Sequence, residues 1–358
     1  MRIGFLIGNM SNAGGTERVL QQIANGLAER GHQVVVISVW GKDELAFPLD
    51  GRITFRRLGD DYPGTVVQHL RTVRGLRRAV REEALPVLVD VDLILTLYSL
   101  PATAGLPGIK RIAWEHFNFY YHFRKNNRLR RVAMRLAARF SHVVLVLTQE
   151  DRAYYEENLK IRGRLCQIYN PNPVEDAVRE DVGGRLVLAA GRLTRAKGFD
   201  LLLESWAEVE AEFPDWTLRI VGEGEERQAL EARREALGLR RVERPGQAAD
   251  MGALYRQAGI FALPSRDEGF GMVLIEAMAY GRPVVSFACK AGPRDIVTDG
   301  EDGFLFPVGD CAGFAQGLRR LMGSEQLRQE LGERARLSVG RFSLRAVLDQ
   351  WEALLNAL

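Results

Sequence analysis

The sequence predicts an α/β protein with two doubly wound parallel sheets. Short runs of β-branched and other apolar residues alternate with amphipathic stretches of helical spacing, which favours parallel strands covered by helices. A stretch typical of a linker, with Pro, Asn and Gly at 170–184, interrupts this alternation, which then starts again. The 358 residues fit two domains of ordinary size, and 46% apolar residues suffice for a core in each. We therefore expect an N-terminal domain at 1–170 and a C-terminal domain at 171–342, facing each other across a cleft.

The expected elements of the first half alternate in type along the chain. Strands are expected at 2–7, 33–39, 53–57, 93–96, 111–114 and 142–147, and helices near 16–30, 65–83, 124–140 and 149–158. In the second half, strands are expected at 186–190 and 260–263, and a helix at 272–278. The last segment, 343–358, predicts an amphipathic helix that packs back on the N-terminal domain.

Charge is unevenly distributed along the chain. Residues 1–165 hold 25 Lys and Arg against 16 Asp and Glu, a net charge of +9, whereas the remainder holds 24 against 30, a net charge of −6. A basic half favours an anionic partner. Because aromatic residues are not interleaved with its arginine runs as in a stacking platform, we do not expect nucleic acid to be that partner.

The sequence predicts a cytoplasmic protein. No run of 18 or more apolar residues is present, and the start, MRIGFLIGNM, holds only a six-residue apolar run. These patterns predict neither a membrane span nor a signal peptide.

No metal site is expected. Cys166, Cys289 and Cys311 lack the CxxC spacing of zinc sites or of a disulfide framework, and the five histidines lack a ligand spacing such as HExxH. Asp90-Val91-Asp92 matches the DxD motif of metal-dependent transferases. However, we expect it on the amino side of a strand at 93–96, away from the ligand-binding edge of the sheet. No serine has the GxSxG setting of a hydrolase nucleophile.

The stretch 260–285 predicts a strand, a loop and a helix. Gly269 and Gly271 in the loop leave room for a ligand against bare backbone, and the unpaired N–H groups of the following helix point to the same place. The loop is therefore a candidate site for a phosphate or another anion.

Two carboxylates flank this loop, Glu268 within it and Glu276 on the helix. Their separation argues against the acid and base pair of a retaining glycosidase, whose carboxyl groups lie within about 5.5 Å. We interpret them as holding two different parts of one long ligand. The alternative is that Glu276 is a solvated helix residue and Glu268 a charge favoured by the helix dipole.

Two more loops between a strand and a helix are candidate anion sites. Gly14 and Gly15 follow the first strand and would expose backbone N–H groups to a phosphate, although neither a GxGxxG fingerprint nor a Walker lysine is present. Arg192 and Lys197 follow the strand at 186–190, where two cations can meet a diphosphate. Taken singly, a double glycine is also common in turns, and basic residues are common in surface loops.

Together these motifs resemble a retaining family 4 glycosyltransferase with the GT-B fold, of the bacterial surface or lipid-linked glycan type. The motifs are GG at 14–15, WEH at 114–116, GRLTRAKG at 191–198, IVGEG at 220–224 and EGFGMVLIE at 268–276. They span nearly the whole chain in the usual order. The E-x7-E element with its upstream Arg and Lys is specific, and the other motifs are moderately so.

The resemblance implies a hexosyltransferase-type enzyme whose donor is a nucleotide diphosphate sugar, a UDP-sugar, bound along the C-terminal domain. Arg192 and Lys197 would neutralise the diphosphate leaving group, so that neither a metal nor another cofactor is needed. Glu276 would hold the ribose hydroxyls, and Glu268 would contact the donor sugar.

Further site residues follow from the same resemblance. Backbone N–H groups around Phe270, Gly271 and Met272, together with Gly15, would complete the cradle for phosphate and sugar. His116 matches the family histidine that faces the donor sugar, with a capping or core histidine as the alternative. Arg244 lies in the region that usually meets the nucleobase.

The implied reaction moves the sugar with retention to a hydroxyl of a lipid-linked or surface glycan. In the family picture, attack comes from the same face through an oxocarbenium-like transition state, and a leaving phosphate oxygen helps to accept the acceptor's proton. The alternative is a nucleotide-sugar epimerase or a non-catalytic nucleotide-sugar-binding module. Incubation with donor alone separates the two alternatives, because an epimerase converts the donor without an acceptor.

Two expected helices of the N-terminal half carry basic stripes beside apolar ones. The arginines are Arg71, Arg74, Arg78 and Arg81 on one helix and Arg124, Arg128, Arg131, Arg135 and Arg139 on the other. The apolar residues are Leu70, Val73 and Val80, and Leu129, Val132 and Leu136, and the aromatic residues Phe117, Phe119, Tyr120, Tyr121 and Phe123 precede the second helix. We expect the protein to dock peripherally through these helices on the anionic cytoplasmic face of a membrane. Two solvated helix faces are the alternative.

Overall fold

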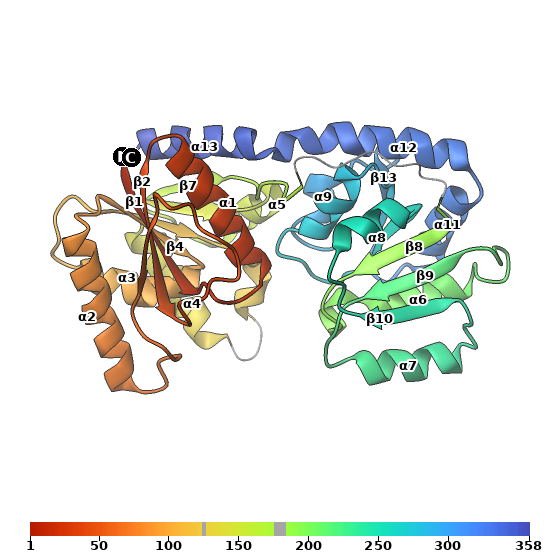
Figure 1. Cartoon of the computed structure of the whole chain (residues 1–358), viewed down its shortest axis with the longest axis horizontal. Coiled ribbons are helices and arrows are strands. Elements are labelled where there is room, and N and C mark those ends of the chain that lie inside the picture. Colours follow the sequence, from red (N-terminus) through yellow and green to blue (C-terminus); the bar gives the residue numbers. More distant parts are fainter. Residues whose placement is uncertain (124–126, 175–183) are drawn as a thin grey trace. The chain divides into compact units, whose positions relative to one another are not determined.

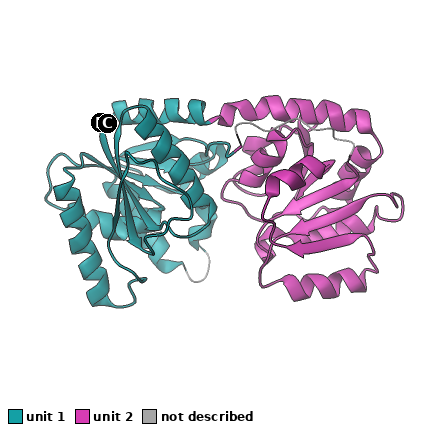
Figure 2. Cartoon of the chain, in the orientation of Figure 1, with its two compact units in different colours: residues 1–173, 344–358 teal, residues 174–343 magenta. Residues whose placement is uncertain are grey.

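The computed structural model describes residues 1–123, 127–174 and 184–358, so most of the linker expected at 170–184 lies outside the described residues. The chain divides into two compact units (Figure 2): unit 1 holds Met1–Pro173 and Leu344–Leu358, and unit 2 holds Val174–Ser343. Each unit contains one parallel sheet, with helices on both of its sides (Figure 1). The predicted fold class, with two doubly wound parallel sheets, is therefore confirmed.

The sheet of unit 1 has seven strands in the order β3-β2-β1-β4-β5-β6-β7. The strands are β1 (Arg2–Asn9), β2 (Gln33–Trp40), β3 (Thr54–Arg57), β4 (Val87–Val91), β5 (Lys110–Trp114), β6 (Val143–Val146) and β7 (Arg164–Gln167). The helices are α1 (Gly15–Glu29), α2 (Val66–Glu82), α3 (Thr96–Thr103), α4 (Arg128–Phe140), α5 (Gln149–Asn158) and α13 (Leu344–Asn356), with short 3₁₀ turns η1 (Leu93–Leu95) and η2 (Phe119–Phe123). The strand order reverses direction between β1 and β4, which are neighbours.

The strand expected at 93–96 is wrong, because these residues form η1 and the start of α3. The true strand, β4, precedes them, and the run from 87 to 95 is apolar apart from two aspartates, so hydrophobicity alone does not mark where the strand ends. Asp92 ends it: its φ is 103°, and its carboxylate accepts a hydrogen bond from the Ile94 amide at 3.1 Å. Strand β7, short and only partly buried, was also not predicted.

This error moves the DxD motif to the other edge of the sheet. Asp90 lies within β4, is buried, and accepts hydrogen bonds from Thr96 at 3.1 Å and Ser99 at 2.6 Å. Asp92 lies at the carboxyl end of β4 and pairs with Arg130. Desolvation raises the pKa of Asp90 to about 7 and that of Asp92 to about 6. Both carboxylates thus have protein partners, and no group of three His, Cys, Asp or Glu within the described residues could hold a metal.

The C-terminal helix α13 is packed into unit 1. Trp351 is fully buried and makes edge contacts with Phe5 and Trp114, with ring centroids 6.0 and 4.8 Å apart. Arg30 at the end of α1 pairs with Glu352 at 2.7 Å. The last helix of the chain therefore completes the core of the first unit.

The sheet of unit 2 has six strands in the order β10-β9-β8-β11-β12-β13. The strands are β8 (Leu186–Ala190), β9 (Thr217–Val221), β10 (Val242–Gly246), β11 (Ile260–Leu263), β12 (Val284–Phe287) and β13 (Gly303–Phe306). The helices are α6 (Phe199–Ala207), α7 (Arg227–Ala236), α8 (Met251–Gln257), α9 (Met272–Ala279), α10 (Pro293–Ile296), α11 (Cys311–Met322) and α12 (Glu325–Ser338), with 3₁₀ turns η3 (Arg195–Lys197) and η4 (Val339–Phe342). Here the order reverses between β8 and β11.

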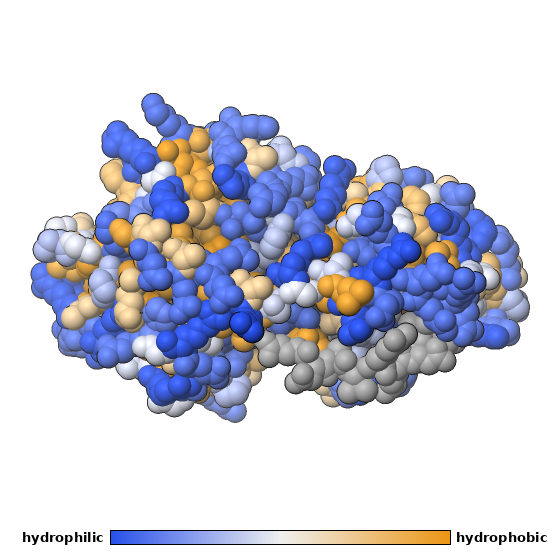
Figure 3. Space-filling view, turned by 90° about the horizontal axis from the view of Figure 1, so that it is seen from above, coloured by the Kyte–Doolittle hydropathy of each residue, from blue (hydrophilic) through white to orange (hydrophobic). Residues whose placement is uncertain are grey.

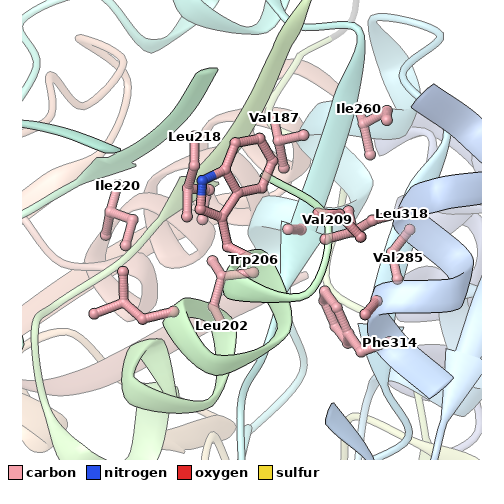
Figure 4. Packing of buried hydrophobic residues seen from close by; sticks show 14 of the residues in the cluster. Val187, Leu202, Trp206, Val209, Leu218, Ile220, Ile260, Val285, Phe314 and Leu318 are labelled. Atoms are coloured by element: carbon pink, nitrogen blue, oxygen red, sulfur yellow. The ribbon is translucent and has the colours of Figure 1, made fainter. Parts of the chain in front are cut away.

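The core of unit 2 lies between its sheet and the helices α6 and α11. Figure 4 shows the indole of Trp206 among residues of the sheet, including Leu218 and Val187, with Phe314 and Leu318 beside them. Trp206 is fully buried, and losing such a side chain costs about 3–5 kcal/mol. This core holds β8 and β11 in place, and both strands lead into the candidate site.

The face of the molecule in Figure 3 is mainly hydrophilic, with hydrophobic side chains gathered in a few small areas. Within the described residues, no helix is both long and apolar enough to span a membrane.

Candidate active site

The candidate site of unit 2 lies where the strand order reverses. Strands β8 and β11 pair directly, and the crevice outside the carboxyl ends of such a pair is where open α/β sheets bind ligands. The loop after β8 carries Arg192 and Lys197, and the loop after β11 carries Glu268. The fold thus brings together two segments that are about seventy residues apart in sequence.

These two loops are held tightly against each other. A Cβ on Gly198, whose φ is 67°, would lie 2.0 Å from the Pro264 carbonyl, so the close approach requires glycine. The Arg266 amide donates to the Ala196 carbonyl at 2.8 Å, and the Arg266 guanidinium binds Asp200 with two hydrogen bonds of 2.6 and 2.7 Å. Because such bidentate pairs fix geometry, the site residues on the loops are held in register.

Lys197 and Glu268 meet at the centre of this arrangement. The Lys197 ammonium donates to both oxygens of Glu268, at 2.7 and 2.8 Å, and the Ser265 hydroxyl donates to Oε1 at 2.6 Å. The Glu268 carboxylate is 7% exposed and Ser265 is fully buried, whereas Lys197 is 27% exposed. A nearly buried carboxylate is thus neutralised by a cation that still faces solvent.

Arg192 is an exposed cation of the same loop. Within the described part of the chain its guanidinium makes no hydrogen bond or ion pair. It is therefore available for an anionic ligand without breaking a contact inside the protein.

Glu276 lies on α9, which begins after the loop. Gly271 precedes the helix with a φ of 100° and accepts a hydrogen bond from the Leu274 amide at 2.9 Å. The first N–H groups of α9 have no partner within the helix and are directed back over the loop. The Tyr255 hydroxyl of α8 donates to Glu276 Oε2 at 2.8 Å.

Phe270, Gly271 and Met272 form the turn into α9. The Phe270 ring is buried against Phe342, with centroids 5.8 Å apart, so its side chain points into the protein. A Cβ on Gly292 would lie 1.9 Å from the Phe270 carbonyl, which shows how closely the loop after β12 supports this turn. At Phe270 the turn can therefore offer only backbone to a ligand, whereas Met272 is partly exposed.

Arg244 is not brought to this group of residues. It lies on β10, which is separated from β8 by β9, and its guanidinium donates to the Arg227 carbonyl at 2.9 Å and pairs with Glu231 of α7. Desolvation lowers the pKa of Arg244. Its predicted role at the nucleobase stays a prediction, and its contacts in this structure are to α7.

The predicted residues of unit 1 occupy the corresponding edge of their own sheet. Gly14 and Gly15 follow β1, which pairs with β4 where the strand order reverses. A Cβ on Gly15 would meet no atom within 4 Å. A Cβ on Gly14 would lie 2.3 Å from a carboxylate oxygen of Glu17. The space around Gly15 therefore leaves the start of α1 open to a ligand.

His116 follows β5 and is 8% exposed. Its ring lies 4.4 Å from that of Trp114, and its Nε2 is buried without a hydrogen-bond partner among the described residues. Burial lowers the pKa of His116 to about 4, so the imidazole is neutral near pH 7. Trp114 Nε1 and His122 Nδ1 are likewise buried without a partner among the described residues, so the unpaired nitrogen does not distinguish a histidine that faces the donor sugar from a core histidine.

The residues that hold the segment after β5 were given no role from the sequence, although Glu115 stands in the WEH motif. Glu115 accepts hydrogen bonds from the amides of His116 and Phe117, at 2.9 and 2.8 Å, and lies 2.8 Å from His122 Nε2. Asp151 accepts from the Phe119 amide at 2.7 Å. The spacing of Glu115 and His122 in the sequence does not indicate that they pair, because their contact depends on the turn η2.

Comparisons with known proteins show the family of the chain. The model of glycosyltransferase family 4 matches residues 13–175, and the model of glycosyl transferases group 1 matches residues 174–338. An uncharacterized glycosyltransferase of Haemophilus influenzae is 32% identical over 356 residues, covering 99% of both chains. A Campylobacter jejuni α-1,4-N-acetyl-D-galactosaminyltransferase is 27% identical and covers 99% of this chain and 98% of its own. The solved structure of HepE from Anabaena with UDP-glucose shares the GT-B fold, with a TM-score of 0.79, 22% identity and full coverage of both chains. The chain belongs to glycosyltransferase family 4.

Proposed function

We propose that the protein is a retaining, metal-independent glycosyltransferase that moves a sugar from a UDP-sugar to a hydroxyl of a lipid-linked or surface glycan. The observation that carries this proposal is the meeting of Lys197, Glu268 and Ser265 on loops joined at the reversal of the strand order, with Arg192 exposed on the same loop as Lys197. Arg192, Lys197 and the N-terminus of α9 can bind the negative charge of a diphosphate. The carboxylates of Glu268 and Glu276 can accept hydrogen bonds from the hydroxyls of the donor sugar and of the ribose.

The diphosphate is bound by Arg192, Lys197 and the first N–H groups of α9. An ammonium has three donors, so Lys197 can keep one bond to Glu268 while it turns another toward a phosphate oxygen. These charges stabilise the negative charge that develops as the diphosphate departs, which is commonly the largest contribution in such a site.

In the proposed reaction, the bond between the anomeric carbon and the phosphate oxygen breaks and the acceptor oxygen bonds to the same face of the sugar. The acceptor's proton passes to an oxygen of the departing diphosphate. Glu268 binds hydroxyls of the donor sugar and Glu276 those of the ribose.

The nature of the donor and acceptor is supported by the relatives. HepE was solved with UDP-glucose, and the name of the Campylobacter enzyme describes an undecaprenol-diphosphate-linked glycan as its acceptor. All three proteins compared above are glycosyltransferases or share their fold, which does not favour the alternative of an epimerase or a binding module.

The protein is proposed to reach a lipid-linked acceptor by docking on the anionic cytoplasmic face of a membrane. Helices α2 and α4 both contact α3, and each exposes arginines and apolar residues on its outer side. The exposed arginines are Arg71, Arg74, Arg78 and Arg81 of α2 and Arg128, Arg135 and Arg139 of α4, and the exposed apolar residues are Val66, Val67 and Leu70 of α2 and Leu129, Val132 and Phe140 of α4. At about 1 kcal/mol per Lys or Arg near such a surface, four engaged arginines give reversible, salt-sensitive binding.

The structure corrects the composition of these stripes. Val80 is buried in the core of unit 1, and Val73 and Leu136 are only partly exposed, so they do not belong to a docking face. Arg124 lies outside the described residues. Apart from Phe140 at the end of α4, the exposed apolar side chains instead lie near the first turns of both helices.

The test is a donor panel with purified protein. UDP-, GDP- and ADP-sugars are incubated with and without an acceptor extract of lipid-linked glycans, and release of the nucleoside diphosphate is measured. Release from one UDP-sugar that depends on the acceptor is expected. Conversion of a donor without acceptor and without release of nucleotide would instead indicate an epimerase, and no change of any donor would indicate a binding module.

A further inference from the structure

Each of the two candidate carboxylates accepts a hydrogen bond from a buried hydroxyl. Tyr255 is 1% exposed and donates to Glu276 at 2.8 Å, and Ser265 is fully buried and donates to Glu268 at 2.6 Å. We propose that Tyr255 and Ser265 are positioning residues, which fix the carboxylate of Glu276 for the nucleotide and that of Glu268 for the transferred sugar. This inference rests on the proposed function, because it assigns a support to each carboxylate of that site.

The Tyr255 hydroxyl is held in one direction by its ring. The ring lies against Phe261 of β11, with centroids 5.7 Å apart, and stacks on Tyr280, at 5.5 Å and an angle of 23°. A tyrosine confined on two sides cannot follow a moving partner, so Glu276 must adopt the rotamer that meets the hydroxyl.

The hydrogen bond from Tyr255 restricts the Glu276 side chain, which burial alone does not fix because Glu276 is only partly buried. A glutamate on a helix surface otherwise samples several rotamers, and a ligand that needs one of them must supply the ordering free energy. With Oε2 bound to Tyr255, this cost is met on folding. Oε1 then has a fixed direction.

Ser265 acts on Glu268 in a different way. Lys197 donates to both oxygens of Glu268. When a diphosphate binds, the ammonium must give one of these two hydrogen bonds to a phosphate oxygen. The Ser265 hydroxyl then keeps Oε1 fixed while the ammonium moves, because Ser265 is buried two residues after the end of β11 and its neighbour Arg266 is bound to Asp200. Its contribution is therefore expected during turnover rather than in nucleotide binding.

The residues that carry the two hydroxyls flank the same strand, β11, in the sequence. Tyr255 precedes β11 on α8 and Ser265 follows it, and every residue of β11 is buried. The supports of both carboxylates thus lie on the segments that precede and follow β11, the strand that pairs with β8 where the strand order reverses.

Two variants of the whole chain test the assignment, each with a matched control. UDP is titrated calorimetrically, and turnover is measured as UDP release from the active UDP-sugar. Tyr255→Phe is expected to weaken UDP binding about tenfold, since it removes one hydrogen bond to a charged group. Ser265→Ala is expected to lower kcat about tenfold with UDP affinity unchanged within about twofold.

The controls remove hydroxyls of similar burial that touch neither carboxylate. Tyr280 is 8% exposed, and within the described residues its hydroxyl makes no hydrogen bond, whereas the buried Ser286 donates to the Phe287 carbonyl. Tyr280→Phe and Ser286→Ala are expected to match the wild type in UDP affinity and in kcat.

The outcomes distinguish this inference from the function on which it rests. Wild-type protein that neither binds UDP nor turns over any UDP-sugar overturns both. An active wild type with a Tyr255→Phe variant of unchanged UDP affinity, or a Ser265→Ala variant of unchanged kcat, overturns the positioning role alone. Equal losses in both readouts for both variants, with a lowered Tm, would mean a merely structural role and would also overturn it.

Discussion

At the scale of single residues, the two candidate carboxylates are expected to separate binding from turnover. If Glu276 holds the ribose, Glu276→Ala should weaken binding of free UDP by about tenfold or more, because it removes hydrogen bonds to a charged group. Glu268→Ala should leave UDP affinity nearly unchanged and lower kcat, because Glu268 contacts the sugar that UDP lacks. Calorimetry with UDP and kinetics with the UDP-sugar measure the two effects. A Glu276→Ala variant that binds UDP as tightly as the wild type would contradict the assignment.

The buried carboxyl group of Asp90 is expected to make the stability of the fold depend on pH. This effect should appear in unfolding measurements and does not require an activity assay. Burial raises the pKa of Asp90 from 3.8 to about 7, so between these values the folded state binds more protons than the unfolded state. The free energy of unfolding should therefore fall as the pH rises through this window. Asp90→Asn cannot ionise, and its Tm is expected to decline less than that of the wild type between pH 5 and pH 8. Parallel declines of Tm in thermal scans of the two proteins would show that Asp90 does not make this contribution.

At the scale of elements, α4 predicts salt-sensitive membrane binding. Sedimentation should recover the protein with anionic liposomes at low salt, but neither with neutral liposomes nor at high salt, because exposed arginines are screened. Arg128→Glu with Arg135→Glu should reduce the recovery. The matched control is Arg240→Glu with Arg241→Glu, two exposed arginines of unit 2, and it should bind as the wild type does. Equal recovery with anionic and neutral liposomes would leave a soluble acceptor as the better account.

The strands beside the site were predictable because strong local signals bound them. Strand β8 ends before Gly191 and β11 before Pro264, and both were predicted at their observed bounds. Strand β4 was missed because the same apolar run continues through η1 to Leu95, and only the backbone turn and the side-chain hydrogen bond of Asp92 separate the strand from η1.

The candidate site was predictable where its residues share a loop or a short motif. Lys197 and Glu268 were named from their motifs, and the structure brings them together. Tyr255 and Ser265 were not named as site residues. Tyr255 and Glu276 are 21 residues apart in sequence, and their contact depends on how α8 packs on α9. Arg244 shows the opposite case, because its position near the expected loop did not reveal its pairing with Glu231.

At the scale of the whole molecule, the path of the chain makes unit 1 depend on its last helix. Trp351 is fully buried against Phe5 and Trp114, and replacing such a residue by alanine costs about 3–5 kcal/mol. Trp351→Ala is therefore expected to lower the midpoint of denaturant unfolding of unit 1. Leu337→Ala, at a residue of α12 that is 66% exposed, is the control and should leave that midpoint unchanged. An unchanged midpoint in Trp351→Ala would contradict the assignment of α13 to the core of unit 1.

The central claim is that protein cations, and not a metal ion, stabilise the departing diphosphate. The most direct measurement is release of UDP from the active UDP-sugar in excess EDTA, made with wild type, Arg192→Ala, Lys197→Ala and the control Arg195→Ala, an exposed cation of the same loop. Undiminished turnover of wild type and of the control is expected in EDTA, and Arg192→Ala and Lys197→Ala should each lose roughly two orders of magnitude in turnover. Activity that EDTA abolishes and Mn²⁺ restores would contradict it.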